Sequence, residues 1–208
     1  MKSIHLLLPI VLFLGITPAF GGYIDFTVAP FNLIHDQSTW STTVDGIEIT
    51  FTAYDSGGPL NFFWDDNDGY RDGIGIQTGE KDEVEYPEIM KLSFSETILF
   101  GYAFLTDLFY ESGYQEEGYY WFDGSSEVHF YADLDQPTGT HGEKTLYIDQ
   151  YVDHIYFSAL GDVWNGGTEE DHEYSVGGIY ITKVPEPSTL LLLSTGLLAG
   201  AAFRKRLH

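Results

Sequence analysis

The densest group of side chains that could bind a ligand is the acidic run 65–73, DDNDGYRDG. Within it, Asp66, Asp68 and Asp72 follow the pattern D-x-D-G-x-x-D. Carboxylates at this spacing can surround a hard cation such as calcium, because the glycine permits a sharp turn. Aspartate, asparagine and glycine are also the residues that an ordinary solvated hairpin loop requires. Both interpretations stay open, and calcium is the only cofactor that the sequence suggests.

Patterns of catalytic residues are missing from the sequence. It contains no HExxH zinc motif, no GxSxG nucleophile motif and no cysteine. The interior histidines show no zinc-ligand spacing. With 31 acidic residues between positions 23 and 183, no pair can be singled out as the two carboxylates of a glycosidase. We therefore expect a domain that is not an enzyme.

A run of aromatic residues offers a second kind of site, for carbohydrate. It comprises Tyr110, Tyr114, Tyr119, Tyr120 and Trp121. Sugar rings can stack on exposed aromatic faces, and Tyr120 with Trp121 is the pair we expect to do so. Packing in a core explains the same residues equally well. A sugar site requires at least two of these rings exposed side by side.

Strand-like segments must position all of these residues. Segments rich in β-branched and aromatic residues recur between turn residues at 23–28, 46–53, 60–64, 88–94, 97–105, 119–122, 127–132, 144–148, 152–159 and 174–184. Ile47, Ile49 and Phe51 alternate with polar residues, which predicts one buried and one solvated face. The pattern predicts an all-β domain, an antiparallel β-sandwich of jelly-roll type.

Charge separates this domain from the two ends of the chain. Residues 23–183 hold 31 acidic and five basic residues, a formal net charge of −26. Such a surface repels phosphate backbones, which excludes nucleic acid as a partner. The sequence has no cysteine, so the hydrophobic core must stabilise the fold without disulfides.

The N-terminal end has the features of a secretory signal peptide. Lys2 precedes the apolar residues 4–16, and small residues around Ala19 and Gly21 follow. An apolar stretch of this length is short against the roughly 20 residues that span a bilayer, which disfavours a membrane anchor. We expect residues 1–21 to be a signal peptide, cleaved after Ala19 or Gly21.

The C-terminal end has three parts in strict order. Residues 184–189 (VPEPST) contain two prolines, which cannot extend a sheet. Residues 189–203 are apolar and predict a transmembrane helix of roughly 22 Å, short against a hydrocarbon layer of about 30 Å. Residues 204–208 begin with three cations, which hold this end in the cytoplasm and the domain outside it. A buried core helix is the alternative for the apolar part.

This order of parts resembles the PEP-CTERM sorting tail, which is also named as an ice-binding protein C-terminal domain. The resemblance lies in Pro185, Glu186 and Pro187, the apolar segment, and the final cations Arg204, Lys205 and Arg206. It implies that a membrane-embedded exosortase of a Gram-negative bacterium recognises Pro185, Glu186 and Pro187 and processes the chain nearby. It also implies exopolysaccharide or other matrix components of a biofilm as partners.

Together these observations predict three regions: a signal peptide (1–21), an acidic ectodomain (22–183) and a sorting tail (184–208). We expect an exported protein, anchored in the inner membrane before processing and then placed at the cell surface or in the extracellular matrix. The alternative is a carbohydrate-binding module that reaches the surface by the same route.

Overall fold

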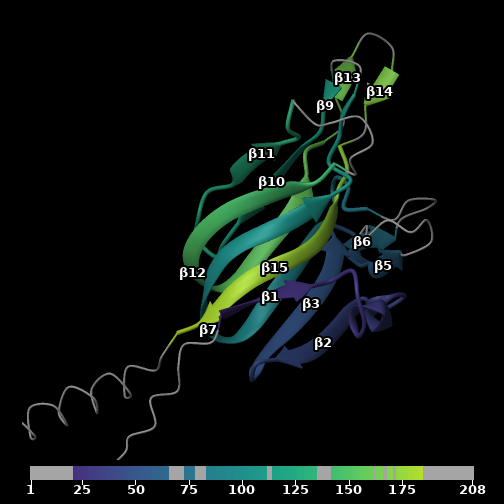
Figure 1. The fold of residues 1–208 in the computed structure, drawn as a ribbon. Coiled ribbons are helices and arrows are strands. Elements are labelled where there is room, and N and C mark those ends of the chain that lie inside the picture. The colour runs from purple at the N-terminus through teal and green to yellow at the C-terminus, as the bar shows by residue number, and fades with distance from the viewer. Residues whose placement is uncertain are drawn as a thin grey trace, which may run out of the picture. The chain divides into compact units, whose positions relative to one another are not determined.

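Antiparallel strands make up almost all of the described chain (Figure 1). The computed structural model describes residues 21–65, 73–77, 83–111, 114–134, 142–161, 163–165, 168–170 and 172–184. Among these residues, the single turn of 3₁₀ helix η1 (Phe31–Ile34) is the only helical element. The prediction of an all-β, antiparallel domain is therefore confirmed.

The two hydrophobic ends of the chain fall outside this description. Almost all described residues belong to one unit, Phe20–Lys183. The signal peptide expected at 1–21, apart from Gly21, and the transmembrane helix expected at 189–203 lie outside the described residues. In the part of the chain that is described, no helix is long and apolar enough to cross a membrane. The signal peptide and the transmembrane helix thus stay predictions.

Eleven of the described strands form one sheet. Four of them are long: β3 (Ile47–Asp55), β7 (Ile89–Thr106), β12 (Lys144–Ala159) and β15 (Ser175–Lys183). The others are β1 (Gly21–Asp25), β2 (Thr39–Val44), β4 (Gly58–Pro59), β5 (Asn61–Asp65), β6 (Gly73–Gln77), β10 (Glu117–Trp121) and β11 (Val128–Tyr131). Two separate pairs join β8 (Tyr110–Glu111) to β9 (Tyr114–Gln115) and β13 (Val163–Asn165) to β14 (Thr168–Glu170).

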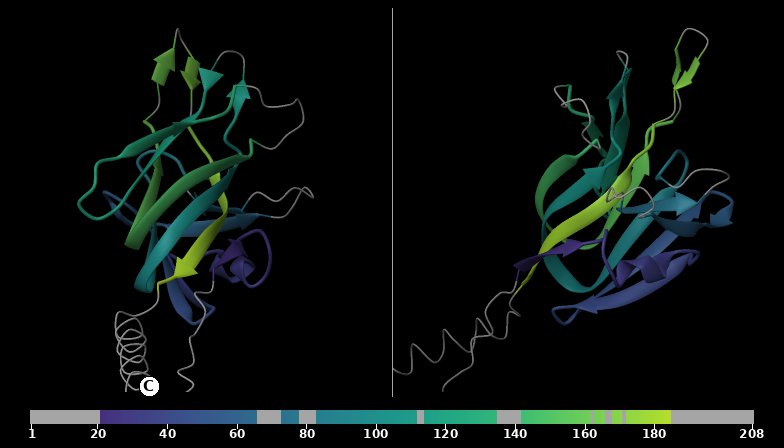
Figure 2. Two further views of the ribbon diagram at one scale, coloured as in Figure 1. Left: turned by 60° about the vertical axis from the view of Figure 1, so that its left-hand side comes forward. Right: turned by 45° about the vertical axis from the view of Figure 1, so that its right-hand side comes forward.

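Strand β7 lies at the centre of the sheet and changes its partner along its length. Residues 89–94 pair with β3, whereas residues 98–106 pair with β15. On its other edge, β7 pairs with β12 over both halves. The sheet therefore curls between the two halves of β7 (Figure 2). This curled antiparallel sheet matches the coarse prediction, and the jelly-roll connectivity stays a prediction.

A β-bulge at Gly101 redirects the second half of β7. Side chains at even positions such as Met90 and Phe100 are buried before it, and those of Ala103 and Leu105 are buried after it. The pairings with both β12 and β15 shift register at this point. A Cβ atom on residue 101 would lie 2.8 Å from Cδ1 of Tyr180. Glycine therefore fits this bulge, where a neighbouring ring approaches the backbone closely.

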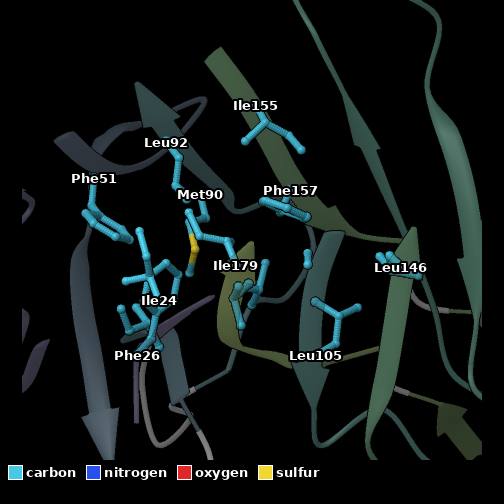
Figure 3. Close-up of a cluster of buried hydrophobic side chains, with 14 of the residues drawn as sticks. Ile24, Phe26, Phe51, Met90, Leu92, Leu105, Leu146, Ile155, Phe157 and Ile179 are labelled. Carbon is cyan, nitrogen blue, oxygen red and sulfur yellow. The ribbon is translucent and has the colours of Figure 1, made fainter. Parts of the chain in front are cut away.

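One hydrophobic core fills the inner face of the sheet (Figure 3). Phe51 from β3, Met90 from β7 and Phe157 from β12 belong to it and are fully buried. Ile47 and Ile49 are also buried on β3, while alternate residues face outward, so the predicted alternation is confirmed. Each such side chain contributes roughly 1.5–3 kcal/mol by leaving water, which lets the core stabilise the fold without disulfides.

Candidate functional sites

The acidic segment predicted as a calcium loop closes a β-hairpin. Strands β5 and β6 pair from Asn61 opposite Gln77 to Asp65 opposite Gly73. Gly73 has a φ of 97°, and a Cβ atom there would lie 2.6 Å from the carbonyl oxygen of Val176 on β15. Glycine is thus required where the hairpin meets β15.

The three carboxylates of the predicted loop, Asp66, Asp68 and Asp72, lie outside the described residues. Calcium binding by these residues therefore stays a prediction. Within the described ranges, no group of three histidine, aspartate or glutamate side chains is placed to hold a metal ion.

Tyr120 and Trp121, the predicted sugar-binding pair, point to opposite faces of β10, because consecutive strand residues alternate. The Tyr120 ring packs against the core, with its centroid 5.7 Å from that of Phe122 and 6.5 Å from that of Phe157. Burial raises the pKa of Tyr120. Trp121 is partly exposed and stacks on Tyr156 of β12, with ring centroids 5.0 Å apart and 10° between the planes. This pair therefore does not form one continuous ring surface.

Trp121 belongs instead to a row that we name the outer aromatic strip: His129, Tyr119, Trp121 and Tyr156. The ring centroid of Tyr119 lies 5.5 Å from that of Trp121 and 5.8 Å from that of His129. The Tyr156 hydroxyl donates a 2.6 Å hydrogen bond to Oδ1 of Asp123. Burial and this hydrogen bond raise the pKa of Tyr156. Tyr119 and Trp121 are thus two adjacent, partly exposed rings, and sugar binding by them stays a prediction.

Buried polar side chains in the described chain bind the backbone of nearby loops. Glu88 and Glu116 accept hydrogen bonds from the backbone N–H groups of Glu85 and Phe109, respectively. Nδ1 of His172 accepts a 2.9 Å hydrogen bond from the backbone N–H of the first residue of β10. Buried backbone donors need such partners, so these three side chains have a structural role in holding two loops and the start of β10.

Four tyrosines that sequence reasoning missed form a row across four neighbouring strands. We name it the tyrosine ladder: Tyr23 of β1, Tyr180 of β15, Tyr102 of β7 and Tyr147 of β12. Each of these tyrosines lies directly opposite the next in the strand register. The Tyr102 and Tyr180 rings are nearly parallel, with centroids 5.2 Å apart and 11° between the planes. Each tyrosine lies in a predicted strand, but the row depends on pairings between segments far apart in the chain.

Comparison with known families assigns the C-terminal tail. Residues 183–206 match the family described as the PEP-CTERM protein-sorting motif. The chain carries a PEP-CTERM sorting motif. The matched range includes the Pro185-Glu186-Pro187 run and the cations at 204–206, which confirms the resemblance seen in the sequence. The PEP-CTERM motif indicates an exported protein that an exosortase processes. No curated protein and no solved structure matches the chain.

The PEP-CTERM motif begins at the residue where the last strand of the sheet ends. Lys183 is the final residue of β15, and its Nζ lies 2.5 Å from Oε1 of Glu96. One residue earlier, Thr182 pairs with Gly21, the first residue of β1. The ectodomain therefore begins and ends on adjacent, paired strands.

Proposed function

We propose that this chain is a cell-surface or extracellular-matrix protein, sorted by an exosortase through its tail, with an ectodomain that does not catalyse a reaction. The PEP-CTERM motif at residues 183–206 carries the proposal. The Pro185-Glu186-Pro187 run is the recognition element. Residues 189–203 hold the chain in the inner membrane before processing, and the cations at 204–206 keep the end of the tail in the cytoplasm.

Features of the ectodomain support a structural role in a matrix. The buried groups of Glu88, Glu116 and His172 bind backbone amides, which is a sufficient reason for their burial. A formal charge of −26 over residues 23–183 favours solubility in a crowded matrix. In this proposal the curled sheet is a sandwich of jelly-roll type, and the partners are exopolysaccharide or other matrix components.

Processing of the tail tests the proposal directly. We would express the chain with Glu186→Ala in a Gram-negative host that has an exosortase, and follow its mass and cell fraction. The variant should keep its tail and stay in the inner membrane, whereas the unchanged chain loses the tail and leaves that membrane. Glu143→Ala, at an exposed ectodomain position, is the matched control and should be processed normally. An unchanged chain that keeps an intact tail in this host, or that is found in the cytosol, would contradict the proposal.

A carbohydrate-binding module is the second candidate, and the outer aromatic strip supports it. Tyr119 and Trp121 are adjacent and partly exposed, and the Trp121 ring also stacks on that of Tyr156. Glycan-array binding by the exported protein should be lost in Trp121→Ala. Tyr120→Ala should lower stability, because the Tyr120 ring packs on the core. Absence of binding to any glycan favours the purely structural role.

A further inference from the structure

We infer that the tyrosine ladder is a binding platform for a neutral polysaccharide chain, separate from the outer aromatic strip. The inference deepens the proposed function and rests on it, because it requires an ectodomain outside the cytoplasm. Strands β12, β7, β15 and β1 lie side by side (Figure 1). At a strand spacing of about 4.8 Å, the backbone positions of the four tyrosines extend over roughly 14 Å. The ring centroids of Tyr23, Tyr180 and Tyr147 lie 6.1, 5.2 and 6.0 Å from that of Tyr102. A row of positions that crosses four strands suits a chain of linked rings better than a single small molecule.

Glycines beneath the ladder let its rings lie close to the sheet. A Cβ atom on Gly178 would come within 2.5 Å of the Tyr23 hydroxyl oxygen. A Cβ atom on Gly21 would lie 2.8 Å from the Tyr180 hydroxyl oxygen, and one on Gly101 would lie 2.8 Å from Tyr180 Cδ1. Any larger residue at these positions would push the rings away from the backbone. The missing side chains therefore let these two rings recline over the sheet, where both stack against the Tyr102 ring.

The two end members of the ladder are exposed to solvent, and Tyr102 and Tyr180 between them are partly exposed. Tyr147 is 76% exposed and Tyr23 is 44% exposed. Tyr151 on β12, next to the ladder, is 67% exposed, and Leu99, opposite it on β7, is partly exposed. A contiguous apolar surface of this kind on a soluble domain usually marks an interaction site. Tyrosine suits such a site, because its ring contacts apolar faces while its hydroxyl binds polar groups.

Charge identifies the class of ligand. Among the described outward-facing residues, Asp25 on β1 and Asp149 on β12 lie at the two margins of the ladder, and no charged residue belongs to the row itself. The remainder of the domain is strongly acidic, so an anionic polymer or an anionic lipid surface would be repelled. A second copy of the chain would be repelled for the same reason. A neutral polysaccharide offers apolar ring faces for stacking and hydroxyl groups for the tyrosine oxygens, without this repulsion.

Affinity electrophoresis of the exported protein, purified in mild detergent, tests the inference. Native gels would contain hydroxyethyl cellulose, galactomannan or dextran as neutral probes, and alginate as the anionic probe. We expect at least one neutral polymer to retard the protein and alginate to have no such effect. Tyr147→Leu removes the flat ring but keeps apolar bulk, and should weaken binding roughly tenfold. Tyr147→Phe keeps the ring and should bind within a few-fold of the unchanged protein.

Matched controls distinguish sugar binding by the ladder from binding by the outer aromatic strip, from self-association and from loss of the fold. Tyr131→Leu replaces a tyrosine that is 44% exposed on β11 and should leave retardation unchanged. Thermal melting checks that Tyr147→Leu is folded, which its high exposure predicts. The inference is overturned if none of the three neutral polymers retards the protein. It is also overturned if Tyr147→Leu is retarded as strongly as the unchanged protein. Loss of binding in Trp121→Ala alone, or a dimer in sedimentation that Tyr147→Leu dissociates, overturns it as well.

Failure of this inference is distinguishable from failure of the proposed function. Glu186→Ala alters processing of the tail and leaves the ladder intact, so its purified protein should be retarded like the unchanged one. Normal processing without retardation contradicts the platform and keeps the sorting proposal. Retardation of a protein whose tail is never processed contradicts the sorting proposal, and it leaves the platform's binding chemistry in place.

Discussion

At the scale of single residues, Tyr174 shows how the domain tolerates a polar atom in its core. Its side chain is fully buried, and its ring meets Phe130 edge-on with centroids 5.2 Å apart. The hydroxyl oxygen is buried and has no hydrogen-bond partner among the described residues. A buried hydroxyl without a partner loses its bonds to water and is therefore destabilising. Tyr174 is held by the packing of its ring.

Tyr174→Phe should accordingly stabilise the protein. The substitution keeps the ring and removes the hydroxyl, so we expect the free energy of unfolding to rise by about 1–3 kcal/mol. Urea denaturation followed by tryptophan fluorescence measures this change. Tyr147→Phe, at a site that is 76% exposed, is the control and should have almost no effect. A lower stability of Tyr174→Phe would show that the hydroxyl has a favourable partner.

The same tyrosine should make stability depend on alkaline pH. Burial raises the pKa of Tyr174 well above its ordinary value of 10.0. The unfolded chain therefore loses this proton above pH 10, while the folded chain keeps it. Ionisation of this group therefore leaves the free energy of unfolding unchanged below pH 10 and lowers it by about 1.4 kcal/mol per pH unit above pH 10. Urea unfolding from pH 9 to pH 11 should show a shallower decline for Tyr174→Phe, and equal slopes would contradict this assignment.

At the scale of elements, β10 is held against the core by a glycine. A Cβ atom on Gly118 would lie 2.4 Å from Cζ of Phe130 and 2.7 Å from Cε1 of Tyr174. These two rings therefore fill the space that a side chain would need. The close approach lets β10 cover the core while Tyr119 and Trp121 face outward.

Gly118→Ala should destabilise the protein, because the added methyl group overpacks this site. We expect a loss of about 1–3 kcal/mol in the free energy of unfolding, measured by urea denaturation. Gly22→Ala is the matched control in β1, where the nearest atom to an added Cβ is Oδ2 of Asp45 at 3.7 Å. The control should change stability by less than about 1 kcal/mol. Equal effects of both substitutions would contradict the packing argument.

The β5–β6 hairpin is the element in which calcium can be tested. Pairing of Asp65 with Gly73 brings together the two ends of the segment that contains Asp66, Asp68 and Asp72. If calcium binds there, excess calcium should raise the melting temperature relative to a chelator, because a ligand of the folded state alone stabilises it. Asp68→Asn should reduce the shift. An unchanged melting temperature would dismiss the loop as a calcium site.

At the scale of the whole molecule, the first strand of the ectodomain is paired with the strand that leads into the PEP-CTERM motif. Gly21 at the start of β1 pairs with Thr182, and the PEP-CTERM motif begins at Lys183. Signal-peptide cleavage after Ala19 preserves all of β1, whereas cleavage after Gly21 removes its first pair. We expect mass spectrometry of the exported protein to find Phe20 as the first residue. A chain that begins at Gly22 would show that this first pair is dispensable.

Sequence alone determined the features that depend on residues near one another in the chain. The order of the C-terminal tail is local and revealed the PEP-CTERM motif. The alternation of Ile47, Ile49 and Phe51 is also local, because side chains alternate along any strand, and it predicted the buried face of β3. The same rule places Tyr120 and Trp121 on opposite faces of β10.

Tertiary structure alone decided the features that depend on pairing between distant segments. The curl of the sheet follows from β7 pairing with β3 in one half and β15 in the other. The tyrosine ladder likewise exists only because β1, β15, β7 and β12 lie side by side in one register. Many registers satisfy the same local alternation, and a shift of one residue would move each tyrosine to the other face. Close packing over the whole core selects among them, and no short segment of the sequence contains that information.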